Sequence, residues 1–134
     1  MTEEELLKQP DDAYMNEQQQ AFFHDLLLSQ REALRARIDS EFGELRHYET
    51  SSDPADIGST EEGRQAHLRL LEREKKLLDK IGHSLQLLAR GEYGWCAETG
   101  EPIGLARLLS RPTATLSFEA KERQESAERH RRER

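Results

Sequence analysis

Apolar residues recur at helical spacing in two long segments of the chain. The first segment follows an N-cap signal at Asn16 and runs to about Tyr48 with one glycine and no proline. Its apolar positions are separated by steps of four, seven, four, four and three residues: Phe23, Leu27, Leu34, Ile38, Phe42 and Leu45. This spacing predicts a long helix with one narrow hydrophobic face, as in a coiled coil.

The pattern breaks at ETSSDPADIGSTEEG, whose Ser, Asp, Pro and Gly residues indicate a turn. A capping box at Ser59 and Glu62 predicts the start of a second helix, and Arg90 followed by Gly91 predicts its end. Five residues form its expected hydrophobic face: Leu70, Leu77, Ile81, Leu85 and Leu88. Because the connector is short, we expect the two helices to pack as an antiparallel hairpin within one chain.

These elements predict a mainly α fold, a long antiparallel coiled-coil hairpin with a small degenerate zinc-ribbon-like globular domain and a C-terminal helix. Residues 1–14 form an N-terminal segment on the globular part, and residues 15–90 form the hairpin with its tip at 49–59. Residues 91–120 form the small domain, and residues 121–134 form the last helix and a basic tail. Seven residues are expected to form the small domain's core: Tyr93, Trp95, Ile103, Leu105, Leu108, Leu116 and Phe118.

Composition and charge narrow the classes of function. Charged residues make up 35% of the 134 residues and hydrophobic ones 34%, which suits long helices better than a thick core. Residues 1–58 carry 14 acids and 5 bases, net −9, whereas residues 59–134 carry 13 acids and 15 bases, net +2. The total of −7 argues against direct DNA binding, which needs a basic surface. The acidic start has no signal-peptide core, and no apolar run could span a membrane, so we expect a cytoplasmic protein.

The loop YGWCAETGEPIG, residues 93–104, holds the chain's only cysteine, Cys96. Thr99 stands where a C-x-x-C pair would have its second ligand, and Ser117 and Ala120 repeat the same spacing after 17 further residues. Cysteine at all four places would predict a zinc ribbon, but Thr and Ser are poor zinc ligands and Ala has none. We therefore expect a zinc-ribbon framework that folds without zinc around an apolar core, with Cys96 buried in it.

Three stretches together carry a family resemblance: DPADIG, EREKKLLDKI and YGWCAETGEPIGLARLLSRPTATLSFEAK. Over nearly its whole length the chain resembles the DksA family of bacterial RNA polymerase-binding factors, and its missing cysteines resemble the zinc-independent paralogues. The resemblance implies a monomeric transcription regulator, not an enzyme, that enters the secondary channel of RNA polymerase. It also implies that the protein potentiates control by ppGpp of promoters such as those of ribosomal RNA.

The resemblance also implies roles for individual residues. The tip near the polymerase active site would be acidic at Asp53 and Asp56, with Gly58 in place of the family's alanine, although Asp-Pro-Ala-Asp alone would also fit a helix start. Arg69 and Arg73 would dock on the polymerase. Four residues would bind ppGpp together with the polymerase: Leu77, Lys80, Arg111 and Lys121.

Two alternative functions remain open. A transcript-cleavage factor could use the same channel, if the tip carboxylates bound a second Mg²⁺ ion within the polymerase. A homodimeric coiled-coil adaptor could pair the amphipathic helices between chains. An enzyme is disfavoured because the paired acids lie on a connector with no pocket expected around them.

Overall fold

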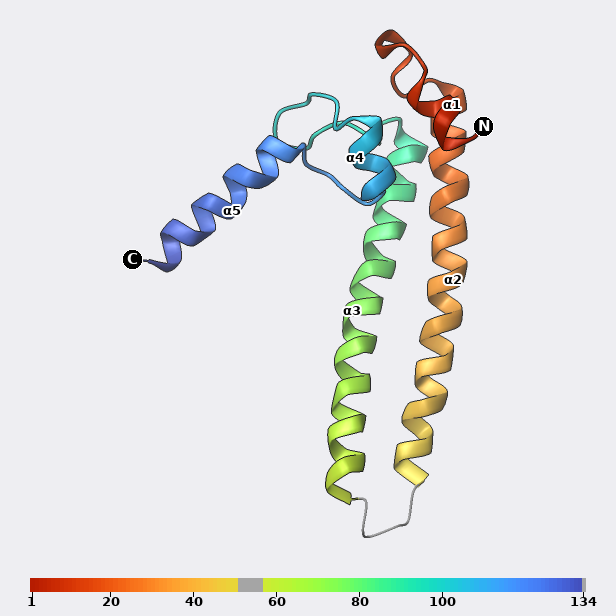
Figure 1. Ribbon diagram of the computed structural model, residues 1–134, viewed down its shortest axis with the longest axis vertical. Coiled ribbons are helices and arrows are strands. Elements are labelled where there is room, and N and C mark those ends of the chain that lie inside the picture. Colours follow the sequence, from red (N-terminus) through yellow and green to blue (C-terminus); the bar gives the residue numbers. More distant parts are fainter. Residues whose placement is uncertain (51–56, 134) are drawn as a thin grey trace. The chain divides into compact units, whose positions relative to one another are not determined.

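The computed structural model describes residues 1–50 and 57–133, with the side chains of residues 1–48 and 61–133 (Figure 1). The elements follow in the order α1 (Glu3–Leu7), η1 (Asp11–Ala13), α2 (Glu17–Thr50), α3 (Ile57–Arg90), α4 (Leu105–Ser110) and α5 (Phe118–Arg132). The long helices α2 and α3 lie side by side and run in opposite directions. The predicted mainly α class, with a hairpin of two long helices and a C-terminal helix, is confirmed.

The chain divides into two compact units. Residues 1–27 and 83–134 form one, which we call the globular unit, and residues 28–82 form the other, the hairpin unit. Each long helix therefore contributes to both units. None of the helices in the described ranges is long and apolar enough to cross a lipid bilayer.

The start of α2 follows the predicted capping signal. The side-chain oxygen of Asn16 accepts a hydrogen bond from the backbone N–H of Gln19 at 2.9 Å. The Gln19 side chain is buried, and its oxygen accepts from the N–H of Met15 at 2.7 Å. Such contacts satisfy N–H groups at a helix start that the helix itself leaves without partners.

The two ends of α3 differ in how well the pattern predicted them. The helix begins at Ile57, so Ser59, the expected N-cap, already lies inside it. The far end agrees with the prediction, because Gly91 follows the last residue with a positive φ of 73°. The N–H of Glu92 then reaches the carbonyl of Leu87 at 2.9 Å, which closes the helix end.

In the hairpin unit, α2 buries the predicted Leu34 and Ile38, and α3 buries the predicted Ile81. Two other expected positions of α3 are off by one. Leu77 is 40% exposed, and the neighbouring Leu78 is half-buried instead. Leu71 is buried, whereas the expected Leu70 is only half-buried. A shift of one residue rotates a side chain by about 100° around a helix, because 3.6 residues make one turn.

The core of the globular unit contains only part of the predicted set. Three of the expected residues are buried: Tyr93, Ile103 and Leu108. Trp95 and Phe118 are 40% and 58% exposed, so their assignment to the core was wrong. The missing apolar surface comes from the other end of the chain, where Leu6, Met15 and Phe23 are buried. Phe23 meets the Tyr93 ring with centroids 5.5 Å apart.

Tyr14 connects the N-terminal segment to two loops of the globular unit. Its hydroxyl donates to the carbonyl of Gly94 and accepts from the N–H of Gly104 at 3.1 Å. Gly94 has a φ of 91°, and a Cβ there would lie 3.0 Å from atoms of both Tyr14 and Met15. Only glycine fits this position without strain, so the N-terminal segment packs directly against the loop backbone.

Candidate functional site

The predicted acidic tip falls at the junction of the long helices. Asp53 and Asp56 lie outside the described residues. Gly58 lies in the first turn of α3. Because α2 ends at Thr50 and α3 begins at Ile57, the sequence between them contains the whole DPAD motif.

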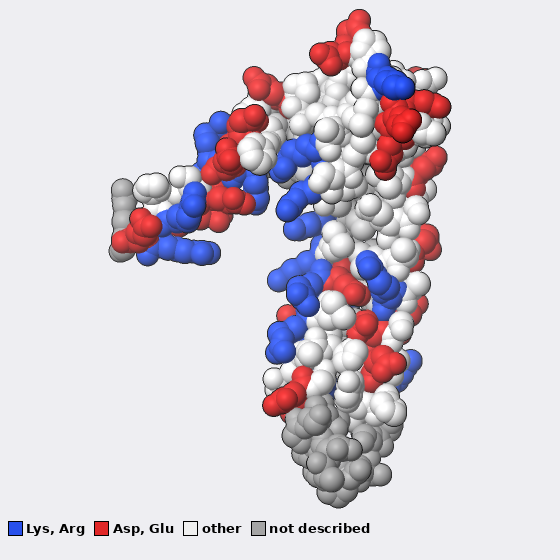
Figure 2. Space-filling view, viewed as in Figure 1, with Lys and Arg blue, Asp and Glu red and all other residues white. Residues whose placement is uncertain are grey.

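A basic face runs along α3, and Figure 2 shows Lys and Arg side chains following this helix. Its four residues are exposed and recur every three or four positions: Arg69, Arg73, Lys76 and Lys80. Within the described part of the chain none of them has an ion-pair partner, whereas Arg64 on the same helix pairs with Glu61 at 3.3 Å. Side chains at this spacing share one side of a helix, so four cations lie together there without being held in ion pairs among the described residues.

The four residues proposed for ppGpp are divided between the two units. Leu77 and Lys80 belong to the hairpin unit, and both are exposed. Arg111 follows α4 in the globular unit with an exposed side chain. Lys121 lies in the first turn of α5, is half-buried, and donates to Gln124 at 3.2 Å. The exposure of Leu77, unexpected for a member of the hydrophobic face, leaves an apolar surface one turn from Lys80.

The residues at the former zinc-ligand positions form hydrogen bonds within the fold. Ser117 is the N-cap of α5, and its hydroxyl accepts from the N–H of Ala120 at 3.2 Å. The Thr99 hydroxyl accepts from the N–H of Glu101 at 3.3 Å. Among the described residues, no group of three or more His, Cys, Asp or Glu side chains is placed to hold a metal ion. Cys96 is therefore the one sulfur or nitrogen ligand of the four positions, and this set does not fit a structural zinc ion.

Cys96 is buried as predicted, with 3% of its surface exposed. Burial raises the pKa of its thiol, but hydrogen bonds to the sulfur outweigh that effect and lower the pKa from 9.0 to about 6. The donors are the hydroxyl of Thr99 and the backbone N–H groups of Ser117, Thr99 and Glu98. The loop and the N-cap of α5 thus both direct donors at one sulfur, which favours the thiolate at neutral pH.

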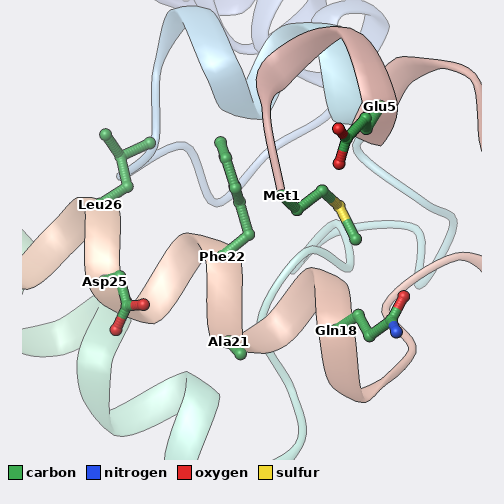
Figure 3. A pocket seen from close by; sticks show the side chains of 7 residues that line it. All are labelled: Met1, Glu5, Gln18, Ala21, Phe22, Asp25 and Leu26. Atoms are coloured by element: carbon green, nitrogen blue, oxygen red, sulfur yellow. The ribbon is translucent and has the colours of Figure 1, made fainter.

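Two further features were not predicted. A groove of about 660 Å³ lies between α1 and the start of α2, where Met1 and Phe22 line it together with the carboxylates of Glu5 and Asp25 (Figure 3). In the hairpin unit, His67 and Glu41 form a half-buried hydrogen bond across the two helices. No sequence signal identifies that pair, because the partners are 26 residues apart.

Comparisons with known proteins cover nearly the whole chain. Residues 19–88 match the family described as DnaK suppressor protein DksA, N-terminal domain. Residues 91–126 match the prokaryotic dksA/traR C4-type zinc finger, although three of its four cysteine positions are changed here.

Named relatives and a solved structure agree with these matches. The RNA polymerase-binding transcription factor DksA of Caulobacter vibrioides is 43% identical over 89% of this chain and 84% of its own length. The protein of the same name from Escherichia coli is 35% identical over 85% of this chain and 76% of its own length. The structure of transcription factor DksA2 from Pseudomonas aeruginosa has 70% identity and a TM-score of 0.90, covering 96% of this chain and all of that one. The chain therefore belongs to the DksA family.

Proposed function

We propose that this protein is a cytoplasmic transcription regulator that binds RNA polymerase as a monomer. The hairpin enters the secondary channel, and Asp53 and Asp56 act near the polymerase active site. The protein acts on promoters such as those of ribosomal RNA, potentiates their control by ppGpp, and neither contacts DNA directly nor acts as an enzyme.

The observation that carries this proposal is the basic face of α3 in a chain whose named relatives bind RNA polymerase. Arg69 and Arg73 are exposed and without ion-pair partners in the described residues, so docking on an acidic surface would not break existing contacts. Charge-assisted hydrogen bonds to arginine are stronger than neutral ones, which favours carboxylates on the partner. The total charge of −7 suits a protein that reaches promoters through the polymerase better than one that binds DNA itself.

The effector ppGpp is a highly charged anion, and three of its four proposed ligands are cations. Lys80, Arg111 and Lys121 each offer hydrogen-bond donors, and exposed Leu77 offers an apolar contact. We expect the polymerase to supply the rest of the site, so the response to ppGpp should require the complex.

We also propose that the protein works without zinc. A zinc ion would balance the charge of a thiolate, and at Cys96 four hydrogen-bond donors supply that stabilisation instead. The melting temperature and transcriptional activity should therefore survive chelation by EDTA. One tightly held zinc ion per chain in elemental analysis, or unfolding in EDTA, would overturn this part of the proposal.

The decisive experiment is multi-round transcription from a ribosomal RNA promoter with purified polymerase, with and without ppGpp. The variant Asp56→Asn should bind the polymerase but lose its effect on transcription, whereas Asp39→Asn, an exposed acid on α2, should behave as the original protein. Equal loss of binding and activity in Asp56→Asn would make that carboxylate structural. Shortened transcripts in the same reactions would instead favour the transcript-cleavage alternative.

Binding is tested separately with Arg69→Ala and Arg73→Ala, each of which should weaken the complex. Arg37→Ala on α2 is a matched control, because it removes an exposed arginine from the other helix. Unchanged affinity in both Arg69→Ala and Arg73→Ala would exclude these two arginines as docking residues. Sedimentation of the protein alone should give the mass of a monomer, and a stable dimer would favour the adaptor alternative.

A further inference from the structure

A small cavity with aromatic walls lies in the globular unit, and none of the residues considered above for polymerase or ppGpp lines it. Its volume is about 210 Å³, and six of its lining residues characterise it: Tyr14, Gln20, Leu88, Gly91, Tyr93 and Trp95. The Tyr14 and Trp95 rings meet edge to face at 90°, with centroids 5.2 Å apart, so they form two walls at a right angle. We call this site the aromatic cavity.

The hydroxyl groups of the two tyrosines are directed elsewhere. The Tyr14 hydroxyl bonds to the backbone at Gly94 and Gly104, and the Tyr93 hydroxyl donates to the carbonyl of Pro112 at 2.7 Å. The two tyrosine rings are therefore held in place by their hydroxyl ends. What they offer to a ligand is their π surface, which carries the negative part of the ring quadrupole.

The remaining walls add further negative potential. Leu88 and Gly91 belong to the C-terminal end of α3, where the helix dipole places a partial negative charge. The Gln20 amide nitrogen donates to the carbonyl of Met15 at 2.6 Å, which leaves the amide oxygen as an acceptor. Neither Lys nor Arg is among the residues that line the cavity.

We propose that the aromatic cavity binds an organic cation, a guanidinium or alkylammonium group. Aromatic faces, a helix C-terminus and a free amide oxygen all favour positive charge, and none favours phosphate or carboxylate. The volume is below the range of pockets that hold whole drug-sized ligands, so it suits one cationic group. The cation could belong to a protein side chain or to a free amine, and the two sources are separable by experiment.

The chain alone, with no polymerase, is sufficient for the test. Trp95 is the only tryptophan, so its fluorescence reports this cavity directly. N-acetyl-arginine amide stands in for a protein side chain, choline stands in for a free amine, and N-acetyl-citrulline amide is the neutral isostere of the first. Matched sodium chloride controls remove the general attraction of cations to a chain of net charge −7.

A saturable fluorescence change should occur with the arginine amide or with choline. The arginine amide should bind at least about two- to five-fold more tightly than the citrulline amide, which is the effect of one cation–π contact at a partly exposed ring. Saturation with the arginine amide alone would assign the cavity to a protein side chain, and saturation with choline alone would assign it to a free amine. Equally tight saturable binding of the arginine and citrulline amides, or no saturable change with either cation, would overturn the proposal.

Variants show whether the cation binds in the aromatic cavity. Because some of them lack Trp95, binding is measured by ligand-observed NMR instead of fluorescence. Trp95→Leu should abolish binding, and Trp95→Phe should retain part of it, because a phenyl ring attracts cations less strongly than an indole. Phe118→Leu is the matched control, since it removes an aromatic ring that is also exposed in the globular unit but does not line the cavity. If Trp95→Leu fails to fold, the partial loss in Trp95→Phe decides the question. An equal loss in Phe118→Leu would contradict the proposed location.

Discussion

The hydrogen bonds to Cys96 predict that the stability of the globular unit depends on pH through one sulfur atom. The pKa of this thiol is lowered from 9.0 to about 6 in the folded protein. Between these two values the unfolded chain binds more protons than the folded one, so stability must rise with pH. The contribution is fully present above about pH 9 and is lost as the pH falls through about 6.

Linkage between protonation and folding sets the size of the effect. For the full difference in pKa, the free energy of unfolding would rise by about 2 kcal/mol between roughly pH 6.5 and 8.5. Solvent near the surface of a small unit screens part of such an interaction, which reduces its contribution to stability. We therefore expect a rise of about 1 kcal/mol over this range.

The assay is urea denaturation across that pH range, followed by the fluorescence of Trp95, the neighbour of Cys96. The variant Cys96→Ser cannot ionise in this range and should lose the pH-dependent gain. Burial raises the pKa of Tyr93 and of Tyr14, so both phenols remain neutral across the window. Parallel pH profiles for the original protein and Cys96→Ser would refute the reasoning, because the hydrogen bonds would then not stabilise a thiolate.

Three further changes have defined outcomes. Gly82→Ala should raise the free energy of unfolding by about 0.5–1 kcal/mol in thermal denaturation. The residue is inside α3, and an added Cβ would meet no atom within 4 Å. A loss of stability would contradict this reasoning. Ser117→Ala should cost about 1 kcal/mol by removing the N-cap of α5, and Ser117→Asp should restore most of that loss. Replacing Lys80 and Lys121 together by Ala should remove most of the ppGpp response in transcription and leave basal activity, since each charged contact contributes about 1.5–3 kcal/mol. An unchanged response to ppGpp would exclude these two lysines as ligands.

The long helices were predictable because their signals are local. Asn16 needs only the next turn of its own helix to act as an N-cap, and Gly91 needs only the turn before it. The face of α3 was harder to predict, because leucines occur as the neighbours Leu70 and Leu71 and again as the neighbours Leu77 and Leu78. Spacing alone permits either member of each pair to face inward, and only packing against α2 selects between them.

The candidate site, too, was predictable only where the signal is local in the sequence. The sequence alone shows that three of the four zinc ligands are missing. The hydrogen-bond donors around the Cys96 sulfur depend on how the backbone folds, which the sequence does not show. Trp95 and Phe118 were assigned to the core on hydrophobicity alone. A unit of this size has too little interior for every large ring, and the N-terminal segment already fills part of it. The contact of Tyr14 with Gly94 spans 80 residues, so no local signal could have revealed it.

The bonds from Tyr14 to both loops also bear on how the chain folds as it is synthesised. They join residues 80 and 90 positions apart, so the globular unit lacks essential partners until the last third of the chain has left the ribosome. The hairpin unit, residues 28–82, is continuous and can form first. Once it has formed, it holds the two halves of the globular unit at the ends of its helices, which shortens the search for these distant contacts. Released chains that end between residues 82 and 94 should accordingly contain a folded hairpin and an N-terminal segment still open to proteases.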